Sequence, residues 1–455
     1  MIIYVGGVLA SFTVVLMIIG VLFPPRKFKK TDKQYTYCVM IAARNEERVI
    51  GQLIESIKRQ DYPQDKIAIF VCADNCTDKT AQVARDAGAI VYEREPSKKR
   101  EFKSQGKALD YLLSCIKRDY ERGIETWDGV MSFDADNLLA SNFFTEYNKA
   151  FNDTRFDYYN CYINSSNWQS NLISSYCSCL NCAGPTLYNT KPKAILGLSH
   201  PARGRGALYR TYMLRHGWKW QRITIDWDSS AEFISKGYRS CYCEAAELFE
   251  EQPITMKIMM RQRMRYIKGH FRVFCMRWWQ LLLGIFIPID WGKKKYRPKE
   301  QKPKFSLAAE VQKRVSCYML FVSIFPLALL TFCYGLLYPL GVLIYGLFTP
   351  GYDVTFALTT VGLYYLTLII KEIVVQSVTV ARNFKNVRIH PLRALFYVFV
   401  WPFYAILIQF VGVYAILTPV KWKKIPHVIG TTIDNVYQDQ KTMKQYLTDR
   451  RAVDD

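Results

Sequence analysis

The sequence predicts an α/β domain with a mostly parallel sheet and helices on both of its faces, joined to α-helical transmembrane segments. Between residues 36 and 133, apolar runs of strand length alternate with segments of helical apolar spacing, which is typical of β–α–β crossover units. Long apolar runs flank this region, and they are long enough to cross a bilayer. With 50% hydrophobic residues among 455, the chain can form both a globular core and membrane helices.

The alternating region resolves into strands and helices with definite positions. The predicted strands span residues 36–43, 67–73, 89–92 and 129–133. The predicted helices span residues 46–60, 77–88 and 106–118. Thr77 offers a cap for the second helix, and Gly88 ends it. In sheets of this kind ligands bind beyond the carboxyl ends of the strands, so polar residues at these ends are candidates for a site.

Polar residues follow three of these strands. They are Asn45 and Glu46 after the first, Asp74 and Asn75 after the second, and Asp134 and Asp136 after the fourth. In extended backbone, residues two apart point to the same side, so the carboxylates of Asp134 and Asp136 converge. Because their like charges repel, we expect a cation there, and carboxylate oxygens favour Mg²⁺ or Mn²⁺. Neither GxGxxG nor GxxxxGK[ST] follows a strand, which weakens the dinucleotide-binding and P-loop interpretations.

The charge balance indicates a polyanionic partner. With 61 Lys plus Arg against 39 Asp plus Glu, the net charge of +22 attracts anionic lipid headgroups, nucleotide phosphates or nucleic acid. The basic run at residues 293–304 follows an apolar stretch with Trp278, Trp279 and Trp291 around it, a pattern that indicates a helix in the membrane interface. We therefore expect this run to lie near anionic lipids, and we expect no nucleic-acid partner.

Four apolar blocks predict a multi-pass protein of the cell membrane. Residues 1–23 carry no charge and precede the basic sequence PPRKFKK, so the domain that follows is expected on the cytoplasmic side. The other blocks span residues 316–348, 354–381 and 391–417. One span per block puts the basic tail outside, against the positive-inside tendency, unless the block at 316–348 is two segments. The sequence leaves the number of spans open.

Two charged residues, Lys371 and Glu372, interrupt one of these blocks. Intramembrane charges often mark a transport path. The preferred interpretation is that both residues sit at the cytoplasmic end of the helix, where water can reach them.

Six short motifs occur in one order along residues 36–270. They are ARNEE, VCADNCTDKT, GKALD, SFDADN, TIDWD and QRMRY, with the basic stretch ARGRGALYR between the fourth and the fifth. The series resembles the membrane-bound family 2 glycosyltransferases of the processive type, which include cellulose, hyaluronan and poly-N-acetylglucosamine synthases. This resemblance implies a cytoplasmic domain of the GT-A type, a UDP-sugar donor and a divalent metal ion, Mg²⁺ or Mn²⁺.

The resemblance implies a donor-binding role for residues of the first motifs. Asp74 matches the carboxylate that contacts the uracil of the donor, and Lys107 is similar to a residue near the diphosphate. Asp134 and Asp136 match a DxD pair at the donor and the metal, and Asp136 is the expected direct metal ligand.

The later motifs imply the catalytic residue and the rest of the substrate site. Asp226 falls at the general base that deprotonates the acceptor hydroxyl, and Asp228 is a rival for that role. Gln262 and Arg265 match residues that hold the diphosphate, and Tyr266 matches the aromatic floor of the acceptor site. The chain departs from the family twice: TED becomes Thr-Ile-Asp, and QxxRW becomes QxxRY. The acceptor is therefore less defined than the donor class.

These patterns predict a division of the chain and a function. The regions are an N-terminal transmembrane helix at residues 1–24, a cytoplasmic GT-A domain at 30–270, an interfacial helix with a basic loop at 271–314, transmembrane segments at 315–418, and a cytoplasmic tail at 419–455. The predicted function is inverting, metal-dependent polymerisation of a UDP-sugar into a β-linked polysaccharide that leaves through the protein's own helices. The alternatives are transfer of one sugar to a lipid and a noncatalytic membrane scaffold. The expected partners are the UDP-sugar, a growing polysaccharide or glycolipid acceptor, and membrane lipids.

Overall fold

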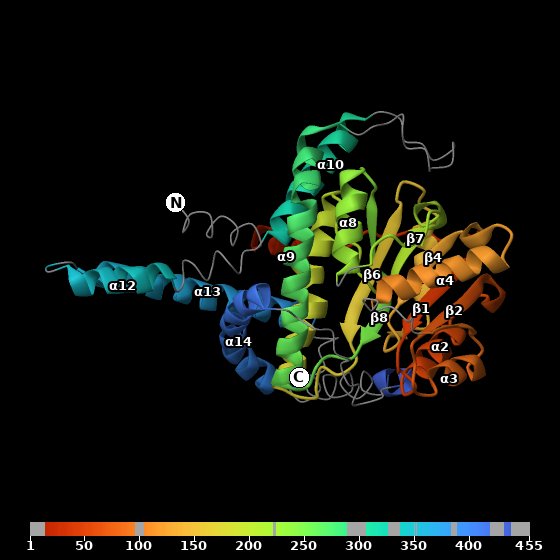
Figure 1. Ribbon diagram of the computed structural model, residues 1–455, viewed down its shortest axis with the longest axis horizontal. Helices are drawn as coiled ribbons and strands as arrows, with labels where there is room; N and C mark the ends of the chain where they lie inside the picture. Colours follow the sequence, from red (N-terminus) through yellow and green to blue (C-terminus); the bar gives the residue numbers. More distant parts are fainter. Residues whose placement is uncertain are drawn as a thin grey trace, which may run out of the picture.

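The structure is a computed structural model of the whole chain. It describes residues 14–95, 104–221, 224–288, 306–325, 337–349, 351, 353–383, 389–418 and 432–437. An α/β domain occupies one side of the molecule, and long helices from the C-terminal part of the chain stand against it or project away from it (Figure 1).

Four strands form the parallel half of an eight-stranded sheet in the described part of the chain. β1 (Tyr37–Ala43) pairs in parallel with β2 (Ile67–Asp74) on one side and with β4 (Gly129–Phe133) on the other, and β3 (Ile90–Arg94) pairs with β2. The predicted positions of these four strands are confirmed to within two residues. Because parallel strands have their carboxyl ends at one edge, the polar residues after β1, β2 and β4 meet there.

The other half of the sheet is mixed, so the prediction of a mostly parallel sheet needs correction. β7 (Ala207–Arg210) is antiparallel to both β4 and β6 (Tyr158–Ser165), and the short β5 (Leu138–Leu139) is antiparallel to β8 (Ser240–Glu250). β6 and β8 are parallel to each other. The predicted crossover units end at β4. Beyond them, the chain leaves β6 and re-enters as β7 from the same end of the sheet, which makes the two strands antiparallel.

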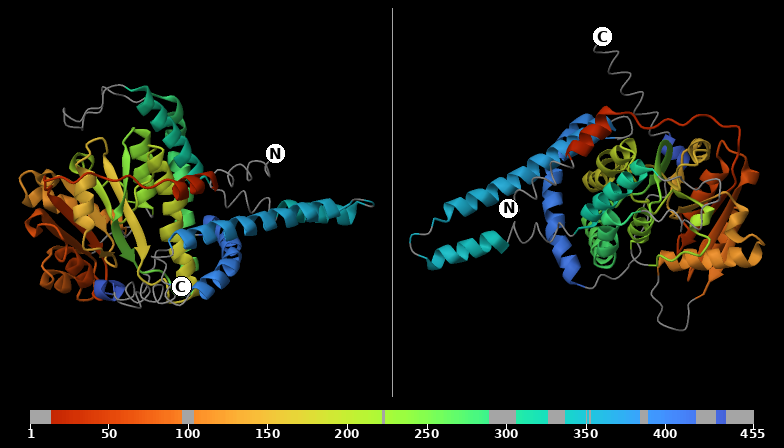
Figure 2. Two further views of the ribbon diagram at one scale, coloured as in Figure 1. Left: turned by 180° about the vertical axis from the view of Figure 1, so that it is seen from behind. Right: turned by 90° about the horizontal axis from the view of Figure 1, so that it is seen from above.

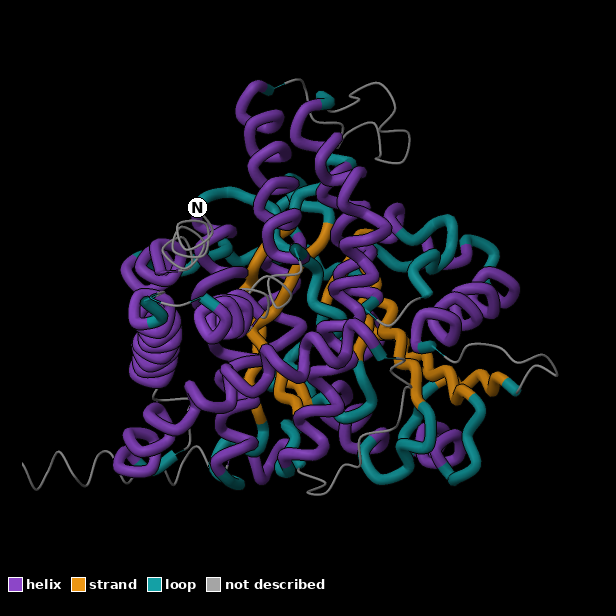
Figure 3. The backbone as a smooth tube through the Cα atoms, turned by 60° about the vertical axis from the view of Figure 1, so that its left-hand side comes forward, coloured by secondary structure: helices purple, strands orange, loops and turns teal. Residues whose placement is uncertain are grey.

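Helices cover both faces of this sheet, as predicted (Figure 3). Along β1 the side chains alternate: Tyr37, Val39 and Ile41 belong to one apolar cluster, whereas Cys38 and Met40 belong to another. The first cluster includes residues of α2 (Ile50–Lys58) and α5 (Phe143–Phe151), and the second includes residues of α4 (Gln105–Asp119) and α8 (Ile225–Ser235). The core is therefore two layers with the sheet between them.

The predicted helix at residues 77–88 is shorter than expected, and the proposed cap is wrong. α3 (Thr80–Asp86) begins after Lys79, which makes no side-chain cap. Thr77 instead accepts a hydrogen bond from Asn45 Nδ2 at 3.0 Å, and its backbone N–H donates to Asn45 Oδ1 at 2.8 Å. Asn45 has a positive φ of 56° and Asn75 one of 54°, so both loops turn sharply at the sheet edge.

In the part of the chain that the structure describes, α9, α10, α12, α13 and α14 follow the α/β domain. α9 (Met256–Phe286) runs along the domain beside α8, and α10 (Leu307–Ile324) packs on both through a shared apolar cluster. α12 (Tyr338–Phe348) and α13 (Thr355–Arg382) project from the domain as an arm, and α14 (Pro391–Leu417) lies against α9 and α13 (Figures 1 and 2).

Two of the described helices are long and apolar enough to cross a membrane, at Val361–Arg382 and Pro391–Leu417. The predicted block at 316–348 contributes the end of α10 and the whole of α12, and its residues 326–336 lie outside the described part. Of the predicted N-terminal span, residues 14–22 form a helix, and Met17 packs there against Leu187 and Val375. Residues 1–13 and the basic run at 293–304 lie outside the described residues.

A short helix at residues 433–437 brings the C-terminal tail back to the α/β domain. Ile433 and Val436 pack against Leu138 and Phe249, next to the strand that follows the Asp134–Asp136 motif. The Tyr437 hydroxyl accepts a hydrogen bond from the Ser141 backbone N–H at 3.0 Å. This part of the tail therefore contacts the domain itself.

Gly106, in the motif GKALD, allows the start of α4 to approach another loop closely. A Cβ atom at this position would lie 2.1 Å from the carbonyl oxygen of Trp220. We predict that Gly106→Ala lowers the free energy of unfolding by about 1–3 kcal/mol, since the loop must shift to make room. Thermal unfolding in detergent measures the change. Gly362→Ala is the matched control because a Cβ there meets nothing within 4 Å, and equal melting temperatures for both variants would contradict the prediction.

Candidate active site

A cavity of about 500 Å³ opens between the sheet edge and helices α8, α9, α13 and α14. At the sheet edge its wall contains Gln105 and Asp134, and at the far end it contains Glu372 and Gln409. Between them lie Asp226 from α8 and the polar end of α9. The cavity thus joins the carboxyl end of β4 to two helices from the candidate membrane region, and it is the natural place for the predicted reaction.

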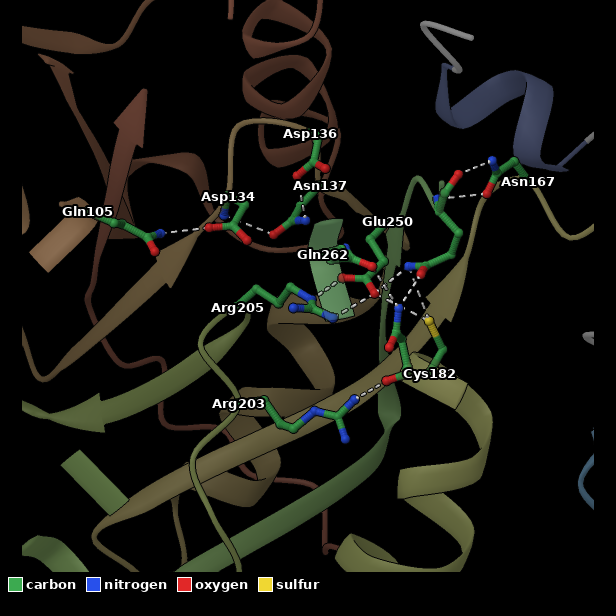
Figure 4. Close-up of polar contacts among 12 residues, drawn as sticks. Gln105, Asp134, Asp136, Asn137, Asn167, Cys182, Arg203, Arg205, Glu250 and Gln262 are labelled. Carbon is green, nitrogen blue, oxygen red and sulfur yellow. Dashed lines mark hydrogen bonds and ion pairs between the residues drawn. The ribbon is translucent and has the colours of Figure 1, made fainter. Parts of the chain in front are cut away.

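The Asp134–Asp136 motif turns away from the end of β4 and is held by local hydrogen bonds (Figure 4). The Asp134 backbone N–H donates to Asn137 Oδ1 at 3.0 Å, and Asn137 Nδ2 donates to Asp136 Oδ1 at 3.2 Å. Gln105 Nε2, from the first turn of α4, donates to Asp134 Oδ1 at 2.6 Å. Asp134 lines the cavity, and both aspartates are partly exposed.

The donor atoms at this motif suit a magnesium or manganese ion that is shared with a phosphate ligand. Among the described residues, no group of three or more His, Cys, Asp or Glu side chains surrounds a possible metal position. The hard oxygen donors at this motif are the carboxylates of Asp134, which lines the cavity, and Asp136, which does not. Mg²⁺ typically takes one or two carboxylates and completes its shell with phosphate oxygens and water, so the pair fits such an ion.

Asp74 lies at the end of β2 and is buried. Its Oδ1 accepts hydrogen bonds from Arg94 Nη1 at 2.8 Å and from Asn75 Nδ2 at 2.6 Å. Lys107 does not line the cavity that holds Asp134. It lines a second hollow, of about 870 Å³, together with Arg94. The first turn of α4 therefore lies between the two hollows. Gln105 contacts Asp134 on one side of it, and Lys107 lines the second hollow on the other.

Asp226 lies in the first turn of α8 and lines the cavity, half-buried. Burial raises the pKa of its carboxyl group above the ordinary value, although the Trp227 backbone N–H and the guanidinium groups of Arg205 and Arg203 oppose that rise. The rival residue Asp228 faces elsewhere: its Oδ1 accepts from Arg277 Nε at 2.7 Å, and it is not part of the cavity wall. Of the two candidates for the base, the structure brings Asp226 to the site.

The motif QRMRY forms part of α9, and its residues differ in their positions. Arg265 and Tyr266 line the cavity, with Arg265 Cζ 5.3 Å from the centre of the Tyr266 ring. Arg263, which the motif does not single out, also lines it, and its Cζ lies 5.5 Å from the same ring. Gln262 is not part of the cavity wall and accepts a hydrogen bond from Asn181 Nδ2 at 3.5 Å.

Sequence reasoning missed two arginines of the ARGRGALYR stretch. Arg203 and Arg205 line the cavity, and Arg203 Nη2 donates to the Asn181 carbonyl oxygen at 2.7 Å. Arg205 forms an ion pair with Glu250, with 2.6 Å between Nη2 and Oε1 (Figure 4). Burial lowers the pKa of Arg205, but the charges of Glu250 and Asp134 outweigh this effect and raise it, so the guanidinium stays charged. The sequence pattern that could have indicated these two residues is a pair of arginines that alternate with glycines just before a strand.

Glu250 is the centre of the buried network behind Arg205. It lies at the end of β8, and its Oε1 also accepts from Gln252 Nε2 at 2.6 Å and from the Cys182 thiol at 3.3 Å. Only the fold brings residues 182, 205 and 250 together, because three separate elements carry them. The network holds the guanidinium of Arg205 in place. Asp134 and Tyr266 also interact electrostatically with this guanidinium.

Glu372 lies ten residues before the end of α13, and the part of α13 after it packs against the α/β domain through Val375 and Val380. α13 continues to Arg382, so Lys371 and Glu372 do not lie at its end. Glu372 lines the cavity, together with Ala405, Ile408 and Gln409 of α14.

A family model described as "Glycosyltransferase like family 2" matches residues 34–269. This chain belongs to that family. Membership of this family supports a glycosyltransferase with a nucleotide-sugar donor over the noncatalytic interpretation. The match covers the GT-A-like α/β domain, in which the sheet is mixed, and includes all six motifs.

Curated relatives of this glycosyltransferase match over short segments. A beta-monoglucosyldiacylglycerol synthase from Synechocystis sp. is 41% identical over 46 residues, which is 10% of each chain. A 4,4'-diaponeurosporenoate glycosyltransferase from Staphylococcus aureus is 49% identical over 53 residues, which is 12% of this chain and 13% of that protein. The matches thus span about a tenth of the relatives' own length.

Solved glycosyltransferase structures are similar at low identity. A mannosyltransferase from Pyrobaculum calidifontis in complex with GDP-Man and Mn²⁺ has a TM-score of 0.42 and 16% identity, over 83% of this glycosyltransferase and 98% of that chain. TarS residues 1–349 from S. aureus has a TM-score of 0.39 and 13% identity, over 77% of this chain and 90% of that one.

The surroundings of Asp226 predict the pH dependence of turnover. A base must be ionised, so activity should fall as the pH drops through the raised pKa of Asp226. Arg203→Gln removes a positive charge that lowers this pKa, so the acid limb of the kcat profile should move to higher pH. Lys236→Gln, at the exposed end of the same helix, is the control and should leave the limb in place. An acid limb that moves to lower pH in Arg203→Gln would contradict the assignment.

The Arg205–Glu250 pair predicts a coupled effect on stability. Glu250→Gln leaves a buried guanidinium without its counter-charge, which costs about 3–5 kcal/mol at a fully buried site. We expect the lower end of this range, since the Arg205 side chain is 20% exposed. The double variant Arg205→Met, Glu250→Gln should be more stable than Glu250→Gln alone. Chemical unfolding of the single and double variants measures the coupling. If the changes in the free energy of unfolding of the two single variants simply add up in the double variant, the two side chains do not interact strongly.

Proposed function

We propose that this protein is an inverting, divalent-metal-dependent membrane glycosyltransferase that transfers sugar from a UDP-sugar to an acceptor hydroxyl and repeats the step to build a β-linked polysaccharide. The observation that carries the proposal is one shared cavity. Its wall includes Asp134 at the sheet edge, Asp226 on α8, and Arg265 with Tyr266 on α9. A diphosphate, a base and an acceptor surface can therefore meet in one cavity.

Asp226 acts as the general base in this proposal. Its carboxylate accepts the proton of the acceptor hydroxyl while that oxygen forms a bond to the anomeric carbon of the donor sugar. The bond from the anomeric carbon to the phosphate oxygen breaks, and its electron pair leaves with UDP. A single displacement inverts the anomeric centre, which gives a β-linkage from an α-linked donor. A pKa above the ordinary value makes Asp226 a better proton acceptor than an exposed aspartate.

Cationic side chains stabilise the leaving diphosphate. Arg265 and Arg205 both line the cavity, and a guanidinium matches phosphate oxygens with paired hydrogen bonds. Asp134 and Asp136 would hold Mg²⁺ or Mn²⁺, and the ion would supply further positive charge to stabilise the leaving diphosphate. Asp74 accepts from the uracil N–H, and Lys107 binds the donor from the neighbouring hollow that it lines with Arg94. Tyr266 offers its ring face to the acceptor sugar.

The position of the cavity supports an acceptor that passes along the membrane helices. Glu372 of α13 and Gln409 of α14 lie in the wall. We propose that α13 crosses the bilayer and that the α/β domain lies on the cytoplasmic side. An even number of crossings after α9 keeps the tail on that side, in agreement with the packing of residues 433–437 on the domain.

A second candidate function is the transfer of a single sugar to a lipid. The observation in its favour is that the printed names of two curated relatives, from Synechocystis and Staphylococcus, concern a diacylglycerol and a diaponeurosporenoate. In this case the acceptor hydroxyl would enter the same cavity from the bilayer, and Asp226 would act in the same way.

UDP release by the full chain in lipid nanodiscs tests the proposed function. With Mn²⁺ or Mg²⁺ and a panel of UDP-sugars, we expect release from one donor and its loss on addition of EDTA. Asp226→Asn should lower kcat by about 10²–10⁴-fold, and Asp136→Asn should weaken the response to metal. Asp86→Asn, on the exposed side of α3, is the control for a lost aspartate.

Mass spectrometry of the product separates the two functions. A ladder of masses spaced by one sugar requires repeated addition, whereas a single added sugar on a lipid supports the second function. Full activity in Asp226→Asn would contradict both.

A further inference from the structure

The C-terminal segment at residues 432–437 lies against the α/β domain at one end of the sheet. It contains the short blue helix beside α2 in Figure 1. In the described sheet β5 is the last strand and pairs only with β8, so no strand covers its outer side. An uncovered sheet edge exposes backbone groups that need partners. The segment packs on this edge and covers it.

The segment docks through apolar side chains that the domain buries. Val436 is fully buried and Ile433 is 8% exposed, and both pack with Leu138 of β5 and Phe249 of β8. A helix this short is not stable alone in water, so its conformation depends on the domain beneath it. The ion pair between Arg59 and Asp434 adds little, because both side chains are more than half exposed.

One directed hydrogen bond accompanies these apolar contacts. The Ala140 backbone N–H donates to the Glu247 carbonyl oxygen at 3.0 Å, and the Ser141 carbonyl oxygen accepts from the Asp61 N–H at 2.8 Å. The Ser141 N–H, in contrast, donates to the Tyr437 hydroxyl at 3.0 Å. The domain thus supplies the partners of the first two groups, and the C-terminal segment supplies the partner of the third.

The strand beneath the segment follows directly after the metal-binding motif. Asn137, which is fully buried, accepts a hydrogen bond from the Asp134 N–H and donates one to the Asp136 carboxylate at 3.2 Å. The next residue, Leu138, packs under Val436. Asn137 is therefore held by β5 on one side and holds the two aspartates on the other, so a shift of β5 would move the carboxylates as well.

The second strand beneath the segment also leads into the site. Phe249 packs against the segment, and the next residue of β8 is Glu250, the counter-charge of Arg205. The charge of Asp134 acts on the Arg205 guanidinium in turn. The segment therefore presses on two strands that each continue, within two residues, into a group of the metal and diphosphate region.

We propose that residues 432–437 are a positioning segment for the metal-binding motif. The segment holds β5, β5 holds Asn137, and Asn137 holds the carboxylates of Asp134 and Asp136. This inference rests on the proposed function, since it assumes that a divalent ion binds these carboxylates. It goes beyond that function because it makes metal affinity depend on a part of the chain that follows α14. No residue of the segment touches the ion or the substrate.

Binding of Mn²⁺ to the full chain in nanodiscs with UDP tests the inference without turnover. Electron paramagnetic resonance measures the free ion. Val436→Asp places a charge in the buried contact and undocks the segment, so we expect the Kd for Mn²⁺ to rise about tenfold, as for a residue that supports a metal ligand. Tyr437→Phe keeps the ring and loses one hydrogen bond, so its Kd should rise about threefold. Tyr414→Phe, at an exposed tyrosine of α14, is the matched control and should bind as the wild type does.

Hydrogen exchange and kinetics separate positioning from simple coverage of the sheet edge. In Val436→Asp the backbone amides of residues 138–141 should exchange faster, because the Ser141 N–H loses its partner. The Mn²⁺ concentration for half-maximal UDP release should rise about tenfold, while kcat at saturating Mn²⁺ stays at the wild-type value. A segment that only covers the edge would instead lower kcat at saturating Mn²⁺ and leave the metal constant unchanged.

The outcomes distinguish this inference from the proposed function. A wild type that binds Mn²⁺, together with Val436→Asp and Tyr437→Phe variants that bind it equally well, overturns the inference alone. Unchanged hydrogen exchange at residues 138–141 in Val436→Asp overturns it too, since the segment would then not hold β5. A wild type that binds no Mn²⁺ in the presence of UDP contradicts the proposed metal dependence and the inference together.

Discussion

The parallel pairing of β1 with both β2 and β4 is the constraint on which the rest of the site depends. It sets the carboxyl ends of these strands at one edge, so Asp74 and Asp134 lie at the same edge of the sheet although 60 positions separate them in the sequence. The start of α4 is held close to this edge, because Gly106 lets it approach the Trp220 backbone. Gln105 can then bond Asp134. Every donor-side feature follows from this arrangement of the sheet.

The second half of the site is built by helices that pack against that edge. α8 brings Asp226, α9 brings Arg265 and Tyr266, and the loop before β7 brings Arg205. The cationic groups have two effects on the chemistry. They offer partners for a diphosphate, and they lower the pKa of an aspartate that burial alone would raise further. A carboxylate with a raised pKa, next to guanidinium groups that can bind a phosphate, is consistent with the proposed sugar transfer.

The sequence predicted the parts of the structure that local patterns determine. The four parallel strands have apolar runs of strand length and turn residues after them, and the motifs at their ends follow from the same runs. The mixed half of the sheet was not predictable, because the direction of β7 depends on how the chain returns after residue 165. Thr77 looked like a helix cap, but it bonds to Asn45 in a loop 32 residues earlier. Glu250 carries no local signal. Arg205 and Glu372 stand out in the sequence, but their surroundings come from elements distant along the chain and could not be predicted.

A structure of the protein in lipid nanodiscs with UDP and Mn²⁺ tests the central claim most directly, that the donor binds at the carboxyl edge of the parallel strands. Electron cryo-microscopy would locate the nucleotide, and the metal appears as a strong peak near the diphosphate. We expect the uracil beside Asp74, the metal at Asp134 and Asp136, and the diphosphate within reach of Arg265. A nucleotide bound elsewhere, or a metal with no ligand from Asp134 or Asp136, would contradict the account.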